Sequence, residues 1–321
     1  MRAVSSVSLL KRFGPVVRAG RSAKWLGRLL GLWRSPNRLF LSIPPGHYYS
    51  PLPDVLEVER AAVFDTDRTE LPGLDLGRDR QLALLDELAR YQREMPFGDA
   101  PQPDLRYHLD NTFFPYPDGV TLYSLLRHLR PARVVEVGSG YSSAVMLDTD
   151  ERFLGGRTEF TFIDPDPGRL HQLLRPADRS RCRVIPERVQ AVPAVVFDAL
   201  TAGDWLFIDS SHVSKIGSDV NHLFFELLPR LAAGVVVHVH DVFWPFEYPR
   251  HWFEQGIAWN EAYLLRGVLT GGRRYRILFF PSYLERHAAA EWAATMPRAT
   301  GRAVSNPLTG AASIYLVVTD D

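Results

Sequence analysis

Seven short hydrophobic runs alternate with longer polar or amphipathic stretches from residue 133 onward. The runs are Val134–Val137, Phe160–Ile163, Val184–Ile185, Trp205–Ile208, Val235–Val239, Tyr275–Phe280 and Ser313–Val318. Turn residues and helix-length segments separate the first five, which is typical of parallel strands covered on both faces. With right-handed crossovers, this predicts an α/β fold with a doubly wound, mostly parallel, seven-stranded sheet. The last two runs depart from the alternation, because a helical insertion around Tyr283–Trp292 separates them.

The chain before this sheet is predicted to be helical and proline-rich. Leucines at three-residue spacing predict a helix over Asp79–Arg93, and a second apolar stripe predicts one over Asp118–Leu129. Prolines between residues 36 and 60 indicate an extended connector. We therefore divide the chain into a basic arm and connector (1–60), a helical or lid segment (61–117) and a catalytic domain (118–321).

The arm combines nine Arg or Lys residues with no acid before Asp54. Its segment Leu9–Trp33 allows three interpretations: an amphipathic helix on an anionic membrane surface or partner, an arginine-rich transit peptide, or a mobile arm or lid helix. Gly14, Pro15, Gly20 and Gly27 interrupt the helical period and favour the third. The sequence has no hydrophobic signal region followed by a cleavage site, so we expect a cytoplasmic protein.

Composition and charge argue against several classes of protein. One cysteine, Cys182, rules out a disulfide framework and a multi-cysteine zinc site. No uncharged apolar run reaches the roughly 18 residues that a membrane-spanning helix needs. The chain has 37 basic and 37 acidic residues. Because the arm is wholly basic, the remainder carries a net charge of −9, which argues against a nucleic-acid partner.

Candidate binding residues follow the first two strands. Gly138 and Gly140 come directly after the first, and Asp164 ends the second. Ligands of open parallel sheets bind beyond the carboxyl ends of the strands, and a carboxylate there can accept both hydroxyls of a ribose. A dinucleotide fingerprint needs a third glycine where this chain has Ser143, and the loop lacks basic side chains for a pyrophosphate. The pattern therefore favours a nucleoside cofactor without phosphates.

These segments resemble the motifs of class I S-adenosylmethionine (SAM)-dependent methyltransferases, especially catechol-type and antibiotic-tailoring O-methyltransferases. Residues 136–143, Ile163–Asp166, Asp204–His212 and Leu227–Asp241 match the motifs in order, and the resemblance covers residues 118–320. It implies a Rossmann-like methyltransferase fold, and it places Gly138, Ser139 and Gly140 under the methionine of SAM. Glu136 would lie near the amino group, Asp164 at the ribose, Gln190 beside the adenine, and Asp209 next to the cofactor.

Polar residues gather after two further strands, at Asp209–His212 and His238–Asp241. In the family that the chain resembles, acids at these places hold a divalent metal that prepares the acceptor hydroxyl. One interpretation is a metal on Asp209, His240 and Asp241, whose mixed donors suit Mn, Fe or Zn better than Mg. Another is His212 or His240 as a general base, with Asp241 beside it and no metal. In the third, the cluster is structural, which is the interpretation we favour for His238.

Aromatic residues are concentrated in three further segments. The loop 243–249 is predicted either to wall an acceptor pocket or to be anchored by packing. Residues 107–118 and 44–53 are predicted to close over the active site and exclude water.

The sequence therefore predicts a SAM-dependent methyltransferase that modifies a hydroxyl of a small molecule or sugar. The alternatives are a catalytically inactive methyltransferase fold serving as a partner module, an NAD-dependent oxidoreductase and a nucleic-acid methyltransferase. The missing third glycine disfavours the oxidoreductase, and the negative charge of the body disfavours nucleic acid.

Overall fold

The computed structural model describes residues 42–61, 63–64, 67–303 and 310–320, which belong to two units. One unit contains the described residues up to 64 together with 250–258, and the other contains the rest. The segment Leu9–Trp33, with its three interpretations, lies outside the described residues. None of the helices in the described part of the chain is long and apolar enough to cross a membrane.

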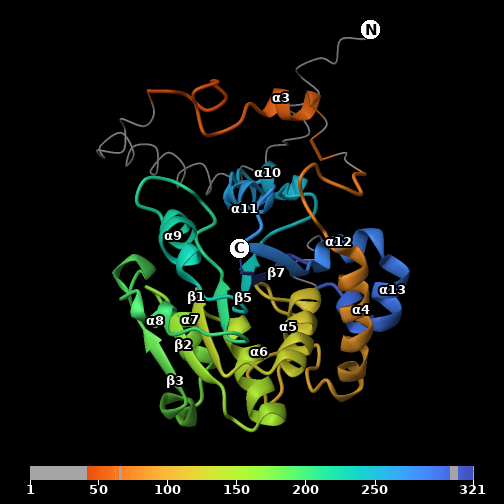
Figure 1. The fold of residues 1–321 in the computed structure, drawn as a ribbon, viewed down its shortest axis with the longest axis vertical. Coiled ribbons are helices and arrows are strands. Elements are labelled where there is room, and N and C mark those ends of the chain that lie inside the picture. The colour runs from red at the N-terminus through yellow and green to blue at the C-terminus, as the bar shows by residue number, and fades with distance from the viewer. Residues whose placement is uncertain (1–41, 62, 65–66, 304–309, 321) are drawn as a thin grey trace, which may run out of the picture. The chain divides into compact units, whose positions relative to one another are not determined.

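The larger unit is built on a seven-stranded sheet in the order β3-β2-β1-β4-β5-β7-β6 (Figure 1). The strands are β1 (Arg133–Val137), β2 (Glu159–Ile163), β3 (Cys182–Ile185), β4 (Trp205–Ile208), β5 (Val236–His240), β6 (Tyr275–Phe279) and β7 (Ser313–Val318). β1 to β5 are parallel, whereas β7 runs antiparallel to both β5 and β6. The predicted doubly wound, mostly parallel sheet is confirmed.

Register brings the carboxyl ends of the central strands to one edge of the sheet. Val137 of β1 pairs with Ile163 of β2 and with Ile208 of β4, and Ile208 pairs with Val239 of β5. The chain order reverses between β1 and β4, which is where open α/β sheets bind ligands. The residues after these four strands are therefore the candidates for a shared site.

The helices of this unit are α4 (Arg78–Leu88), α5 (Tyr116–Leu129), α6 (Tyr141–Thr149), α7 (Gly168–Leu173), α8 (Val195–Asp198), α9 (Asp219–His222), α11 (Glu261–Leu269), α12 (Pro281–His287) and α13 (Ala289–Thr295). The first predicted helix is α4, whose last predicted turn continues as a 3-10 helix over Ala89–Glu94. The second is α5, in which Pro117 lies in the first turn. The predicted insertion between β6 and β7 forms α12 and α13. α4 contacts β6, and α12 contacts β7.

The smaller unit contains α3 (Val55–Arg60) and α10 (Arg250–Glu254). The prediction of an extended connector through residue 60 is wrong for residues 55–60. Asp54 accepts hydrogen bonds from the backbone N–H groups of Leu56 and Glu57, and this N-cap starts a helix. Within the unit, Arg250 forms an ion pair with Glu59 at 2.8 Å.

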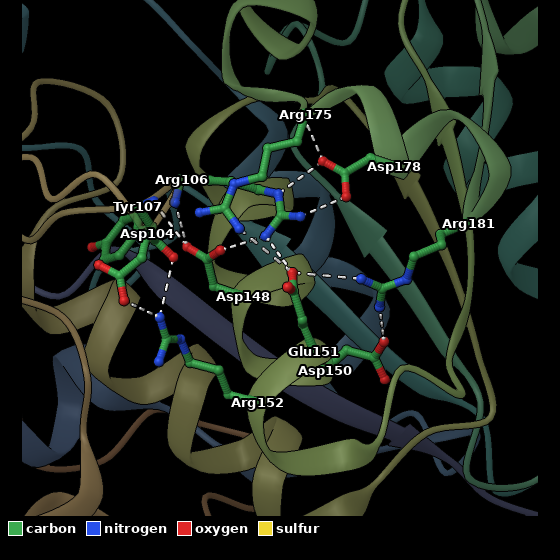
Figure 2. Close-up of polar contacts among 10 residues, drawn as sticks. All are labelled: Asp104, Arg106, Tyr107, Asp148, Asp150, Glu151, Arg152, Arg175, Asp178 and Arg181. Carbon is green, nitrogen blue, oxygen red and sulfur yellow. Dashed lines mark hydrogen bonds and ion pairs between the residues drawn. The ribbon is translucent and has the colours of Figure 1, made fainter.

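A buried ion network attaches the segment before α5 to α6 (Figure 2). Arg106 lies between Asp148 of α6 and Asp178, at 2.6 Å and 2.5 Å, and its side chain is 2% exposed. Asp148 also accepts the backbone N–H groups of Arg106 and Tyr107. The guanidinium thus neutralises two carboxylates whose charges would otherwise be unpaired in the protein interior, at a large cost in free energy. The hydrogen bonds to Asp148 also hold the backbone of residues 106–107 beside α6.

The aromatic loop after β5 is anchored by packing. Phe243, Trp244, Phe246 and Tyr248 are buried, and the Trp244 ring lies against Tyr283 at a centroid distance of 5.0 Å. The segment 107–118 is also largely buried, with Phe113 exposed. That this segment and residues 44–53 close over the active site stays a prediction.

Candidate active site

The turn after β1 requires glycine at its first position. Gly138 has φ +82°, and a Cβ built on it would lie 1.9 Å from the carbonyl oxygen of Asp209. No side chain fits at that distance, so Gly138 lets the first and fourth strand ends approach one another. Gly140 has extended backbone with φ 167°, and its N–H donates to the Ser143 hydroxyl at 3.0 Å.

A cavity of about 570 Å³ opens at this turn. Five of the predicted cofactor residues line it: Gly138, Ser139, Asp164, Gln190 and Asp209. Asp164 accepts hydrogen bonds from the N–H and the hydroxyl of Ser139 at 3.0 and 3.1 Å, which fixes its carboxylate against the turn. Gln190 donates to the carbonyl of Gly217, which also lines the cavity, at 3.0 Å. The volume is within the usual range for small-molecule sites.

Three basic side chains that the sequence analysis did not select also line this cavity: Arg169, Arg188 and Lys215. Arg169 follows β2 on α7, and its guanidinium carbon lies 3.5 Å from the centroid of the Phe113 ring. Phe113 in turn stacks on Tyr141, the first residue of α6. No motif around Arg169 distinguishes it from the many other arginines of the chain, so only the fold reveals that it faces the cavity.

Glu136 is the predicted cofactor residue whose surroundings differ most from expectation. It is fully buried and is not among the residues that line the cavity. The hydroxyls of Ser142 and Ser143 donate to its two carboxylate oxygens, the first at 2.5 Å. Burial raises the pKa of Glu136 to about 8 in spite of these hydrogen bonds. Gly140 likewise does not line the cavity.

Two carboxylates and one imidazole converge beside the cavity. Each of Asp209, His212 and Asp241 offers a ligand atom within 4.8 Å of the others. The Nε2 atom of His212 lies 3.2 Å from Asp209 Oδ1 and 3.4 Å from Asp241 Oδ2. His212 and Asp241 have φ values of +59° and +56°. Non-glycine residues adopt such values at an energetic cost, and here the turned backbone directs both side chains toward Asp209.

Three carboxylates surround the His212 ring. Its Nδ1 lies 2.9 Å from Oε2 of Glu261, a buried residue that begins α11. Burial lowers the pKa of His212, but hydrogen bonds to Asp209 and Glu261 outweigh this effect and raise the pKa well above its ordinary value. For Asp209, burial acts in the opposite direction and raises the pKa. The hydrogen bond from His212 and the charge of His240 outweigh burial and bring the pKa of Asp209 below its usual value. Burial raises the pKa of Asp241.

His240, predicted as a metal ligand or base, lies at the edge of this cluster. Its Nε2 is 3.7 Å from Asp241 Oδ1, and its Nδ1 is 3.4 Å from the Ser313 hydroxyl. Its ring packs 5.0 Å from that of Phe114, and it is not one of the three residues that offer convergent ligand atoms. His238 lies two residues earlier on β5 and is buried, and its ring stacks on that of Phe207 at a centroid distance of 3.7 Å. The structure thus brings His212, rather than His240, between the two aspartates.

Comparison with known proteins agrees with this architecture. Residues 135–242 match the model of a family described as a methyltransferase domain. An uncharacterized protein of Archaeoglobus fulgidus is 35% identical over 130 residues, which are 39% of this chain and 58% of that protein. The chain therefore spans about three fifths of the length of this curated relative. Residues 135–242, which include the glycine turn and Asp241, are therefore similar to a methyltransferase domain, in agreement with the resemblance seen in the sequence.

Solved structures with similar chains include two methyltransferases. An SAH-bound methyltransferase from Podospora anserina is 16% identical, with 78% of this chain and 99% of that chain covered and a TM-score of 0.40. The O-methyltransferase TomG from Streptomyces achromogenes, in complex with SAM, is 14% identical, with 83% and 96% covered and a TM-score of 0.39.

Proposed function

We propose that this protein is a SAM-dependent methyltransferase that methylates a hydroxyl group of a small molecule or a sugar. The observation that carries the proposal is the adjacency of two features. A cavity lined by the Gly138 turn and the Asp164 carboxylate opens at the strand ends, and the cluster of Asp209, His212 and Asp241 lies beside it.

The residues that line the cavity fit SAM. When bound there, SAM supplies a methyl group on a positively charged sulfur. Asp164 would accept the ribose hydroxyls, because it lines the cavity while Ser139 holds its carboxylate in place. Gln190 would lie beside the adenine. Both assignments use residues at the carboxyl ends of the strands, where this class of sheet binds ligands.

Recognition of the methionine part is assigned differently from the sequence-based expectation. Glu136 is enclosed by Ser142 and Ser143, whereas Arg169 lines the cavity beside the glycine turn. A Cβ on Gly140 would lie 3.0 Å from Arg169 Cδ, so this side chain reaches the start of α6. Among the described residues no carboxylate forms an ion pair with Arg169. We therefore assign the guanidinium to the methionine carboxylate, which it can bind through two parallel hydrogen bonds.

The cluster of Asp209, His212 and Asp241 would prepare the acceptor. Two carboxylates and an imidazole fit a divalent metal, and a metal there would lower the pKa of the acceptor hydroxyl. The alternative is His212 as a metal-free base. Asp209, His212 and Asp241 offer three ligand atoms that all lie within 4.8 Å of one another, and this convergence favours the metal.

The test is calorimetric titration of metal-stripped, full-length protein with SAM, followed by a screen of hydroxyl compounds for formation of S-adenosylhomocysteine in the presence of Mn²⁺. Binding of SAM together with methylation at oxygen supports the proposal. Asp164→Ala should weaken SAM binding strongly, and unchanged binding would show that the cavity is assigned wrongly. If the wild-type protein does not bind SAM, the proposal fails and the partner module becomes the better interpretation.

A further inference from the structure

Glu261 lies behind the cluster and uses both of its carboxylate oxygens there. Oε2 lies 2.9 Å from His212 Nδ1, and Oε1 accepts the hydroxyl of Ser210 at 2.9 Å. The side chain is 1% exposed, and Glu261 does not line the cavity. A carboxylate in this place cannot reach a bound substrate directly. Its contacts act on the orientation of His212.

The backbone also fixes His212. The N–H groups of Asn260 and Glu261 both donate to the His212 carbonyl, at 3.1 and 3.2 Å. The N–H of His212 donates to the Ser210 hydroxyl at 2.9 Å, and the Trp259 ring packs over the imidazole at a centroid distance of 4.3 Å. The ring is therefore held on its Nδ1 side and on one face, so that Nε2 is the ring atom directed at Asp209 and Asp241.

We propose that His212 Nε2 is the nitrogen ligand of a divalent transition-metal site completed by Asp209 and Asp241, and that Glu261 is its positioning residue. A buried carboxylate on the distal ring nitrogen is the usual support of a metal-binding histidine, because it fixes the tautomer and makes the ligand more basic. The imidazole distinguishes this donor set from an all-oxygen one, and it selects Mn²⁺, Co²⁺ or Zn²⁺ over Mg²⁺. The inference rests on the proposed function only for what the metal does.

The experiment is titration of metal-stripped, full-length protein with Mn²⁺ and Mg²⁺ by calorimetry, with pulsed EPR of the Mn²⁺ complex. Nitrogen hyperfine coupling is expected in the wild type and should be lost in His212→Ala. Glu261→Gln keeps the size of the side chain and one acceptor oxygen. It should weaken Mn²⁺ binding about 10- to 100-fold, the usual effect of losing such a partner.

His238→Phe is the matched control, because it removes another buried histidine that lies outside the three-residue cluster. It should leave both the Mn²⁺ affinity and the nitrogen coupling as in the wild type. Wild-type affinity in Glu261→Gln, nitrogen coupling that persists in His212→Ala, or Mg²⁺ binding as tight as Mn²⁺ binding would overturn the proposal.

SAM titrations of the same proteins separate the two proposals. Binding of SAM by a wild type that takes up no metal would overturn the metal site and leave the methyltransferase proposal standing. Binding of Mn²⁺ with nitrogen coupling, but without SAM binding, would support the metal site and overturn the methyltransferase proposal.

Discussion

Glu261 and His212 are joined through both their side chains and their main chains, although 48 residues separate them along the chain. The ring Nδ1 of His212 lies 2.9 Å from Oε2 of Glu261, and the N–H of Glu261 donates to the carbonyl of His212 at 3.2 Å. The first residue of α11 and the turn after β4 therefore behave as one element. A substitution of either residue should shift the imidazole relative to Asp209 and Asp241, which contact its Nε2 side.

Gly138→Ala should destabilise the protein and impair SAM binding. The added Cβ would lie 1.9 Å from the Asp209 carbonyl, and φ +82° is unfavourable for alanine. Gly203→Ala is the control, since Gly203 has φ +88° and no atom within 4 Å of its Cβ position. Backbone strain alone costs about 1–2 kcal/mol. Urea unfolding should show a larger loss for Gly138→Ala than for Gly203→Ala, and equal losses would contradict the role of the close approach.

Arg169→Ala should lower the affinity for SAM without changing that for 5′-methylthioadenosine. The two ligands share the methylthioadenosine part, but 5′-methylthioadenosine lacks the positive charge on sulfur and the amino acid chain, whose carboxylate is the group assigned to Arg169. Loss of a charged hydrogen bond of about 1.5–3 kcal/mol corresponds to roughly a 10- to 100-fold weaker affinity. Calorimetry with both ligands measures the difference. Equal weakening for the two ligands would assign Arg169 to the nucleoside or to the shape of the cavity instead.

Arg106→Met should cost about 3–5 kcal/mol of the free energy of unfolding, because it leaves Asp148 and Asp178 buried without their counter-charge. Arg152→Met removes a comparable pair, with Asp104, whose side chains are 36% and 70% exposed. That control should cost no more than about 1 kcal/mol. Denaturant unfolding of the two variants provides the comparison. Similar small losses would mean that the network does not hold residues 106–107 on α6.

Glu136→Gln should change how stability depends on pH. Burial raises the native pKa of Glu136 from 4.5 to about 8, so between these values the native state keeps a proton that the unfolded state has lost. The free energy of unfolding therefore falls as the pH rises through this window, by at most about 1.4 kcal/mol per pH unit. Urea unfolding at pH 5 and pH 8 should show a larger decrease for the wild type than for Glu136→Gln. Parallel decreases would mean that Glu136 is ionised in the native protein.

The sequence by itself determined the sheet and the location of the candidate site. Short apolar runs mark the seven strands, because a buried parallel strand is apolar on both faces, and the ligand site of such a sheet lies after its strands. Gly138, Asp164, Asp209 and Asp241 could therefore be found by reading the ends of the runs. The helix at residues 55–60 was missed because a single capping aspartate, and no apolar period, starts it.

Only the tertiary structure decided which polar residues meet at the site. The resemblance suggested His240 as a ligand or base, because the family's metal-binding acids lie at the ends of these strands, but a left-handed backbone at His212 carries that ring between the aspartates instead. Two serines on the next helix close over Glu136, and Glu261 and Arg169 arrive from distant helices. Such contacts depend on backbone turns and on helix packing, and neither leaves a periodic signal in the sequence. A local pattern therefore identified the edge of the sheet but not the side chains that meet there.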